Sequence, residues 1–291
     1  MKIRDILQST KPLLSFEVFP PKSTDKFESV RTATAEIAAL QPAFMSVTCG
    51  AGGTEVGGFT ARIAAELQRA HGVPTVAHLT SVNASKNNIR ERLAELKELG
   101  IENIFALRGD LPAGVSPTAF DFPHAVDLVR EIRAFGDFSV GCAAYPEGHP
   151  ESKNEREDIR YLAEKVAAGC DFMTTQMFFD NNILYNFLFK ARDAGITVPV
   201  IAGIMPVTNA AQTKRICDLS GTVLPPRFKR IVDRFGDNPA AMRDAGIAFA
   251  TEQIVDLFAN GIHAVHVYSM NKPDVASAIL SNLSAILKKD Q

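Results

Sequence analysis

The sequence predicts an α/β protein, a (β/α)8 TIM barrel that covers residues 1–291 as a single domain. Eight short apolar stretches recur along the chain, each of strand length and rich in branched or aromatic residues. Helical patterns separate them, and this alternation is typical of a parallel sheet with helical crossovers. A TIM barrel uses roughly 250 residues, nearly the length of this chain, and a count of eight favours a closed barrel over an open doubly wound sheet.

Each apolar stretch runs into a polar or charged residue. The stretches are 13–19, 44–50, 74–80, 103–109, 139–145, 172–178, 199–205 and 264–270. Near their ends stand Glu17, Thr48, His78, Arg108, Asp110, Tyr145, Gln176 and Tyr268. A closed parallel barrel brings the carboxyl ends of its strands to one rim, where TIM barrels carry their active sites. We therefore expect these side chains to meet there.

Helix signals fill the intervals between the stretches. Ser85 and Asn87 are candidate caps of a helix that stops at Gly100, and Asn238 with Pro239 begins a helix that runs to about Ala259. Further helices are expected over 25–40, 151–168, 181–194 and from about 273 onward. The seventh crossover is the longest, with helical patterns at 208–220 and 225–235. Such a long connection often contributes to a substrate pocket.

Composition narrows the functional class. The net charge of −2 argues against a nucleic-acid partner, because no basic excess is present to neutralise phosphates. No stretch reaches the roughly 18 apolar residues of a membrane span, and the N-terminus lacks the apolar core of a signal peptide. We therefore expect a cytoplasmic protein that does not bind membranes. The four cysteines, Cys49, Cys142, Cys170 and Cys217, are expected to be small buried side chains in a reducing compartment.

Two carboxylates are candidates for catalysis. Glu17 lies among apolar residues and shares one strand face with Ser15. Burial would favour its neutral form, which suits a general acid, while the alternative is a solvated acid that pairs with Lys22. In Arg108-Gly109-Asp110 the glycine permits close approach of a flat ligand, the arginine can bind a phosphate or carboxylate, and the aspartate offers a fixed negative charge. The alternative there is an Arg108–Asp110 ion pair.

The histidines do not form a metal-binding set, so no metal site is predicted. His263 and His266 are three apart and would point to opposite faces of a strand, whereas His78 and His149 lie near strand ends and are candidates for ligand contact. A hydrogen-bonded structural histidine is the alternative for both. Asp158 and Lys165 share a helix face, as cofactor contacts or as surface charges, and the glycine-rich segment 50–54 is either a mobile active-site loop or a plain turn.

An ordered series of motifs resembles the methylenetetrahydrofolate reductase family, of the bacterial single-domain type. Any one of these short motifs would be weak, but all occur in the family's order between residues 13 and 272. They are Phe16-Glu17-Val18-Phe19-Pro20-Pro21, Ser46-Val47-Thr48, Ala77-His78-Leu79-Thr80, Ala106-Leu107-Arg108-Gly109-Asp110-Leu111-Pro112, Ala144-Tyr145-Pro146-Glu147, Thr175-Gln176-Met177-Phe178-Phe179-Asp180, Gly203-Ile204-Met205-Pro206-Val207 and His266-Val267-Tyr268-Ser269-Met270-Asn271.

The resemblance implies a barrel that binds FAD and reduces 5,10-methylenetetrahydrofolate to 5-methyltetrahydrofolate, with NAD(P)H as electron donor and ping-pong hydride transfer through flavin N5. It implies that Glu17 is the acid that opens the folate ring and that Asp110 acts beside the flavin and the pterin. The implied FAD contacts are Thr48, His78, Arg108, Gly109, Asp110, Tyr145, His149, Asp158 and Lys165. The implied contacts with folate or nicotinamide are Glu17, Gln176, Gln212, Tyr268 and Lys272.

Three positions depart from the family pattern. Cys49 stands where an aromatic residue is common, Ile216 where bacterial members have a phenylalanine that packs on the nicotinamide nucleotide, and Lys272 where some members have arginine. The Ile216 departure leaves an alternative open, in which a partner protein delivers the electrons. A second alternative is a non-redox barrel that binds a pterin and transfers a one-carbon group. We also expect a homo-oligomer.

Overall fold

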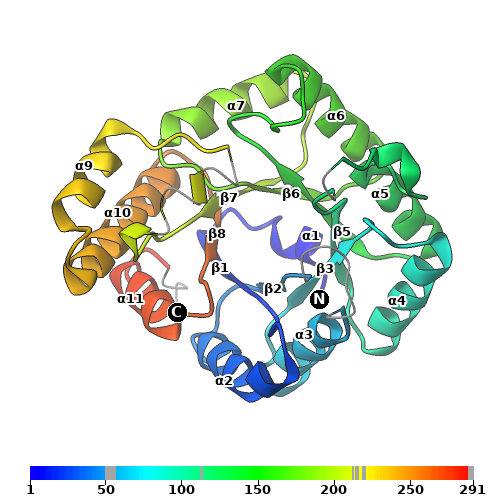
Figure 1. Cartoon of the computed structure of the whole chain (residues 1–291), viewed down its shortest axis with the longest axis horizontal. Coiled ribbons are helices and arrows are strands. Elements are labelled where there is room, and N and C mark those ends of the chain that lie inside the picture. The colour runs from blue at the N-terminus through cyan, green and yellow to red at the C-terminus, as the bar shows by residue number, and fades with distance from the viewer. Residues whose placement is uncertain (50–56, 112–113, 212, 214–215, 218–220, 288–291) are drawn as a thin grey trace.

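A closed barrel of eight parallel strands forms the centre of the computed structural model (Figure 1). The structure describes residues 1–49, 57–111, 114–211, 213, 216–217 and 221–287. Each strand pairs with the next along the chain, and the eighth closes the barrel against the first, with Glu17 opposite Tyr268. The strands are β1 Leu13–Val18, β2 Met45–Val47, β3 Thr75–Thr80, β4 Asn103–Leu107, β5 Ser139–Ala144, β6 Phe172–Thr175, β7 Val200–Ile204 and β8 Ala264–Tyr268. The predicted TIM barrel is confirmed.

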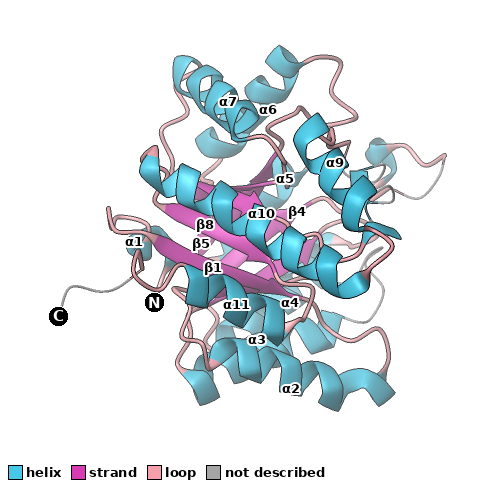
Figure 2. Cartoon of the chain, turned by 90° about the vertical axis from the view of Figure 1, so that its left-hand side faces the viewer, coloured by secondary structure: helices cyan, strands magenta, loops and turns pink. Residues whose placement is uncertain are grey.

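An outer ring of helices surrounds the strands (Figures 1 and 2). A short helix, α1 Ile3–Ile6, precedes the barrel, and short 3-10 turns occupy Thr24–Lys26 and Pro117–Ala119. The other described helices are α2 Phe27–Ala38, α3 Gly57–His71, α4 Lys86–Glu98, α5 Ala125–Phe135, α6 Glu155–Ala167, α7 Asn181–Asp193, α9 Pro226–Phe235, α10 Pro239–Ala259 and α11 Pro273–Asn282.

Several helix ends follow the predicted caps. The Ser85 hydroxyl accepts a hydrogen bond from the backbone N–H of Asn88, and the Asn238 side chain accepts from Ala240 and Ala241. Helix α6 starts later than the predicted residue 151, because Asn154 caps it by accepting from the backbone N–H of Glu157. The segment before Asn154 is instead a turn at the barrel rim. Of the predicted helix over 208–220, several residues lie outside the described part of the chain.

The strands separate two apolar layers. Leu14, Phe16 and Val18 of β1 pack in the layer between strands and helices, with residues such as Ile37 of α2. The inward face of β1 instead carries Ser15 and Glu17, as the alternation of strand side chains requires. Apolar residues fill one end of the barrel interior: Ile3, Leu7, Phe44, Val76, Phe105, Phe172, Ile201 and Ala264.

Helix α1 plugs the amino-terminal end of the barrel. Ile3 is fully buried, and its backbone N–H donates to Asn103 Oδ1 at 2.8 Å. The same Asn103 side chain donates to the Thr75 carbonyl at 3.1 Å, so one buried amide joins α1 to β3 and β4. Figure 2 shows α1 at one end of the strands. The space for a ligand therefore lies at the carboxyl ends of the strands.

No helix in the described ranges is both long and apolar enough to cross a lipid bilayer. Among the same residues, no group of three or more His, Cys, Asp or Glu side chains has the arrangement of a metal site. Cys142 and Cys170 are buried, as expected, whereas Cys49 and Cys217 are only half-buried.

Candidate active site

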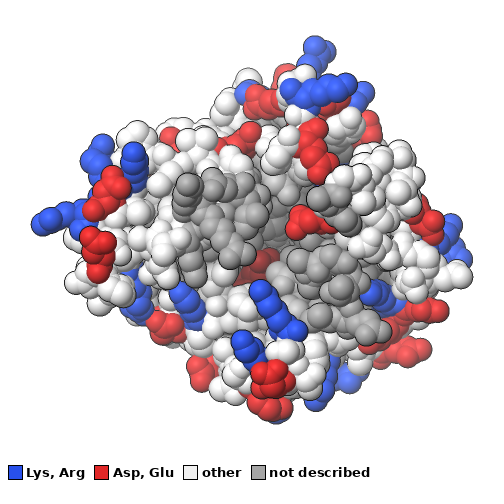
Figure 3. Space-filling view, viewed as in Figure 1, with Lys and Arg blue, Asp and Glu red and all other residues white. Residues whose placement is uncertain are grey.

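A cavity of about 290 Å³ opens at the carboxyl ends of the strands. Figure 3 looks onto this end of the barrel and shows a hollow near its centre, with acidic side chains in it. Six of the predicted site residues line the cavity together: Glu17, Thr48, His78, Tyr145, Gln176 and Tyr268. A larger groove of about 920 Å³ lies between α6 and α7, but none of the predicted site residues lines it. The barrel cavity is therefore the candidate active site.

Glu17 projects from β1 into this cavity. Its side chain is 22% exposed, and the alternative of a solvated surface acid does not describe it. Burial raises the pKa of the Glu17 carboxyl to about 8, while a hydrogen bond with Ser46 acts in the opposite direction and does not cancel that effect. Glu17 is therefore protonated at neutral pH and can act as a proton donor.

His78 lies beside Glu17 on the cavity wall. Its ring stacks on Phe105 with centroids 4.8 Å apart, and its Nε2 is 3.7 Å from Glu17 Oε2. Burial lowers the pKa of His78 to about 3. Both groups are therefore uncharged near pH 7, so the two side chains are neutral neighbours and not an ion pair. A neutral imidazole can accept or donate one hydrogen bond to a ligand.

His266 is a site residue that the sequence reasoning missed. It lines the floor of the cavity, with Nδ1 2.7 Å from Ser15 Oγ and Nε2 2.8 Å from Ser46 Oγ. Burial, followed by the nearby His78, lowers the pKa of His266 to about 3. A signal was present in the sequence: His266 is two residues before Tyr268, so the strand alternation that turns Tyr268 inward also turns His266 inward.

Tyr268 and Gly203 fit together across β7 and β8. The Tyr268 hydroxyl donates to the Thr175 carbonyl at 2.5 Å. A Cβ added at Gly203 would lie 2.5 Å from the Tyr268 hydroxyl oxygen and 2.2 Å from the Thr175 carbonyl oxygen. Glycine is therefore required at this position in β7, because it leaves the space that the Tyr268 ring occupies.

Gln176 and Thr48 stand at the carboxyl ends of β6 and β2. The Gln176 backbone N–H donates to the Ala144 carbonyl at 2.7 Å, and its side-chain Oε1 accepts from the Met177 N–H at 2.9 Å. The Thr48 backbone N–H donates to the Val18 carbonyl at 3.0 Å. These backbone bonds extend the strand pairing by one residue and fix the positions of both polar side chains at the cavity.

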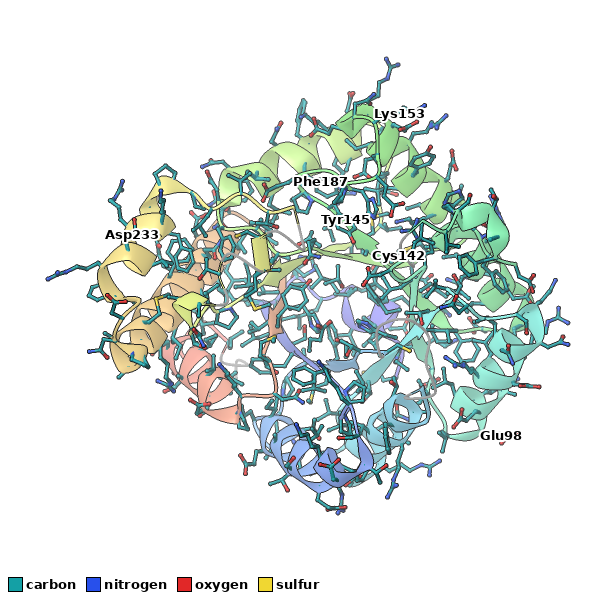
Figure 4. All side chains as sticks on the ribbon, in the orientation of Figure 1. Glu98, Cys142, Tyr145, Lys153, Phe187 and Asp233 are labelled. Atoms are coloured by element: carbon teal, nitrogen blue, oxygen red, sulfur yellow. The ribbon has the colours of Figure 1, made fainter. Side chains whose placement is uncertain are left out.

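Tyr145 forms the β5 side of the cavity. Its ring meets the edge of the His149 ring with centroids 4.6 Å apart. Burial raises the pKa of the Tyr145 hydroxyl, and the negative charge of Asp110 adds to that effect. Figure 4 shows Tyr145 toward the centre of the barrel, in contrast with Lys153 and Asp233 on the outer rim.

The Arg108-Gly109-Asp110 segment borders the cavity without lining it. Arg108 forms a two-pronged ion pair with Glu151, at 2.7 and 2.6 Å, in place of the Arg108–Asp110 pair considered from sequence. Gly109 has φ +90°, and a Cβ there would lie 2.7 Å from Val82 Cγ1, so glycine is needed for the turn. Asp110 is exposed.

The remaining predicted residues support the rim. Asp158 is buried and accepts from the His149 backbone N–H at 3.3 Å and from the Ser152 hydroxyl at 3.1 Å, so it holds the turn before α6. Lys165 Nζ donates to the Ala143 carbonyl at 3.1 Å. Lys272 Nζ donates to Thr208 Oγ1 at 2.8 Å in a small hollow that Ile216 also lines. Gln212 and the glycine-rich segment 50–54 lie outside the described residues.

Comparison with known proteins decides the family. A family model described as methylenetetrahydrofolate reductase matches residues 2–284. The chain belongs to the methylenetetrahydrofolate reductase family. It is 34% identical over 299 positions to the Arabidopsis thaliana protein named methylenetetrahydrofolate reductase (NADH) 1, an alignment that covers 98% of this chain and 50% of that protein. The chain thus spans about half the length of this plant relative.

A bacterial relative is matched over most of its length. The Escherichia coli protein named 5,10-methylenetetrahydrofolate reductase is 32% identical over 270 positions, which cover 93% of this chain and 90% of that protein. Among solved structures, an uncharacterized protein from Clostridium thermocellum described as binding two copies of 5-methyl-5,6,7,8-tetrahydrofolic acid has a TM-score of 0.65 at 13% identity, with 98% and 99% of the two chains covered. That likeness supports the fold of this methylenetetrahydrofolate reductase family member.

Proposed function

We propose that the protein reduces 5,10-methylenetetrahydrofolate to 5-methyltetrahydrofolate, with bound FAD and with NAD(P)H as the electron donor in a ping-pong cycle. The observation that carries this proposal, together with family membership, is the acid at the cavity floor. Opening the folate ring needs a proton donor near neutral pH, and burial raises the pKa of Glu17 to about 8.

The cavity residues fit the flat ring of FAD. A volume of about 290 Å³ lies near the lower end of ligand pockets, which suits a ring system and not a whole dinucleotide. Thr48, His78 and Tyr145 would contact the ring. Arg108, at the rim, carries the charge to meet the diphosphate, alongside Asp158 and Lys165, which organise that side. When bound, FAD supplies two-electron hydride chemistry that no side chain of the protein can perform.

Glu17 would act on the folate. Its carboxyl proton passes to N10 as the bond between N10 and the bridging carbon breaks, and the bonding electron pair stays on nitrogen. The one-carbon unit remains on N5 as an iminium cation, ready to accept a hydride. The Glu17 carboxylate left behind must then regain a proton from solvent before the next turnover. Gln176 and Tyr268 line the same cavity and would orient the pterin ring.

Asp110 would supply the negative charge that balances the cation. Its charge raises the pKa of Tyr145 on the cavity wall, so its field reaches the place where the ligand would lie. A fixed carboxylate stabilises a developing positive charge without reorganisation. The pair of Glu17 and Asp110 thus follows a recurring arrangement, in which a buried carboxyl gives the proton and a second, exposed carboxyl stands near the developing cation.

The side chain of Ile216 bears on the identity of the electron donor. Ile216 lines a small hollow beside Lys272 and Met205, which gives this hollow an aliphatic side where a bacterial member offers an aromatic ring. That substitution favours a second candidate, in which the same reductase receives electrons from a partner protein. The predictions of a homo-oligomer and of a cytoplasmic location accompany both candidates.

Spectroscopy of the purified protein tests the proposal. The expected result is a flavin spectrum that NADH or NADPH bleaches anaerobically and that 5,10-methylenetetrahydrofolate restores, with 5-methyltetrahydrofolate identified by mass spectrometry. Bleaching by dithionite but by neither nucleotide would favour the partner protein. A folded protein that binds no flavin, or one that forms no 5-methyltetrahydrofolate from the reduced state, would contradict the proposal, and a flavin-free preparation that transfers the one-carbon group would indicate the non-redox alternative.

A further inference from the structure

We propose that Ser15, His266 and Ser46 form a one-directional hydrogen-bond relay that presents only an acceptor to Glu17 and so holds this acid in its proton-bearing form. We call these three residues the serine–histidine relay. His266 is then a positioning residue for proton donation, because it acts on Glu17 through Ser46. The proposal rests on the proposed function for its role in catalysis, but the direction of the hydrogen bonds follows from the structure alone.

The direction is fixed at the Ser15 end of the relay. The Ser15 hydroxyl lies 3.0 Å from the Val265 carbonyl oxygen and donates to it. A carbonyl can only accept, and a serine hydroxyl has a single proton to give. Ser15 Oγ must therefore accept at its second contact, which is His266 Nδ1 at 2.7 Å. The proton of the imidazole is thus assigned to Nδ1.

The position of the proton on the His266 ring fixes the direction of the next hydrogen bond, to Ser46. His266 is 2% exposed and stacks on Phe44 with centroids 5.5 Å apart, an environment that favours the uncharged ring. An uncharged imidazole with its proton on Nδ1 has a bare Nε2 that can only accept. Ser46 Oγ, at 2.8 Å from Nε2, must therefore donate its one proton to His266.

At the Glu17 end, Ser46 can then only accept. Ser46 and Glu17 stand opposite each other in the β1–β2 pairing, and both line the cavity. A protonated Glu17 completes the relay by donating to Ser46 Oγ. An ionised Glu17 would face an oxygen lone pair, since the Ser46 proton is committed to His266. A Ser46 hydroxyl that was free to donate would stabilise an ionised Glu17 and lower its pKa, but the hydrogen bond to His266 withholds that proton.

The other titratable groups at the cavity floor do not counter the relay. His78, 3.7 Å from Glu17 on β3, and Tyr268 on β8 are both uncharged near neutral pH, because burial lowers the pKa of His78 and raises that of Tyr268. Neither side chain offers a positive charge to an ionised Glu17. Once Glu17 has given its proton to the folate, the relay favours the return of a proton from water.

The test replaces Ser15, at the end of the relay farthest from Glu17, and measures the position of the His266 proton and the pKa of Glu17. In Ser15→Ala the fixed acceptor of the Nδ1 proton is lost, so the imidazole can carry its proton on Nε2 and donate to Ser46, which can then donate to Glu17. We expect ¹⁵N NMR to show His266 with its proton on Nδ1 in the wild type and on Nε2 in Ser15→Ala. We also expect ¹³C NMR of labelled glutamate carboxyls to show the Glu17 pKa falling by about one unit.

Two variants serve as controls. Ser15→Thr keeps the hydroxyl and should restore both wild-type values. Ser139→Ala removes another buried hydroxyl, one that accepts from the Arg4 N–H at 3.1 Å and does not line the cavity, and should leave both values unchanged. The resonances are assigned by their loss in His266→Gln and Glu17→Gln.

Two results would overturn the relay. One is a wild-type His266 with its proton on Nε2, a measurement that needs no variant and so survives a failure of Ser15→Ala to fold. The other is a folded Ser15→Ala protein whose Glu17 pKa equals that of the wild type. Neither readout requires turnover. If the protein does not reduce folate but both NMR results are as expected, the proposed function fails and the relay stands.

Discussion

The side chain of Asn271 brackets the backbone of Phe19, two residues after Glu17. Asn271 Oδ1 accepts from the Phe19 N–H and Asn271 Nδ2 donates to the Phe19 carbonyl, both at 2.9 Å. The neighbouring Ser269 hydroxyl donates to the Glu17 carbonyl at 2.5 Å. Met270 and Asn271 have φ of 53° and 52°, in the left-handed region, and together they turn the chain back toward β1. The segment after β8 thus clamps the acid-bearing end of β1.

Replacing Asn271 with alanine should weaken this clamp. Asn271→Ala removes both hydrogen bonds and places a less tolerant residue at a left-handed position, so we expect a loss of about 1–3 kcal/mol in the free energy of unfolding, measured with urea. Asn271→Gly is the matched control, because it removes the bonds without the backbone strain. Unfolding free energies equal to the wild type in both variants would show that the clamp does not stabilise the fold.

Gly203→Ala should be poorly tolerated. The added Cβ would lie 2.2 Å from the Thr175 carbonyl oxygen, which belongs to the backbone and cannot move aside cheaply. We expect a loss of about 1–3 kcal/mol or more in unfolding free energy, and Tyr268→Phe should not rescue it because the backbone contact remains. Gly58→Ala, where no atom lies within 4 Å of the added Cβ, is the control and should be neutral or slightly stabilising. A stable Gly203→Ala protein would mean that β7 can shift outward.

Glu17→Gln should separate the two half-reactions. Glutamine keeps the shape of the side chain but has no acidic proton, so we expect bleaching of the flavin by nucleotide to persist and folate reduction to fall by at least about 100-fold, measured by stopped flow. Glu98→Gln, on the exposed surface of α4 at the outer rim (Figure 4), is the control and should change neither rate. Equal losses in both half-reactions would remove Glu17 from the role of the acid.

The raised pKa of Glu17 should also appear in stability. Its folded-state pKa is about 8, against an ordinary value of 4.5, so the folded protein binds the extra proton between these two pH values. Stability from this group is complete below pH 4.5 and is lost as the pH rises to 8, at up to about 1.4 kcal/mol per pH unit. Glu17→Gln should therefore gain in unfolding free energy over the wild type from pH 5 to pH 8. A constant difference across that range would argue for an ordinary pKa.

Asp110→Asn should change both the reduction potential of the flavin and the rate of folate reduction. Removing the negative charge is expected to slow folate reduction and to raise the reduction potential of the flavin, because the reduced flavin would no longer be disfavoured by a nearby anion. Spectroelectrochemistry measures the potential, and Asp233→Asn on the outer rim (Figure 4) is the control. An unchanged or lower potential would place Asp110 outside the electrostatic reach of the cofactor.

Local sequence patterns were sufficient to predict the barrel. Each of the eight apolar stretches contains a strand, although β2 is shorter than predicted, Met45–Val47 against 44–50. The cap at Ser85 and the start of α10 at Pro239 were also predicted, because both depend on neighbours a few residues away. The same local reasoning predicted that Glu17 and five other residues at strand ends would meet at one cavity.

The features that were missed depend on residues far apart in the sequence. Helix α1 has only four residues, too few for a periodic pattern to predict it. It is held by Asn103, which lies 100 positions from Ile3. Arg108 forms its ion pair with Glu151, 43 positions away, and not with Asp110, the nearby partner considered from sequence. His266 was considered only as a metal ligand beside His263, whereas its partners are serines on β1 and β2.

Closure of the barrel by β8 sets the stage of synthesis at which Glu17 becomes buried. Ser15 and His266 are separated by 251 positions, and the clamp from Ser269 and Asn271 comes from the same late segment. In a chain that lacks β8, Glu17 would lose the neighbour that covers it on that side, and burial would no longer raise its pKa. Synthesis of the eighth strand would therefore complete both the barrel and the proposed proton donor.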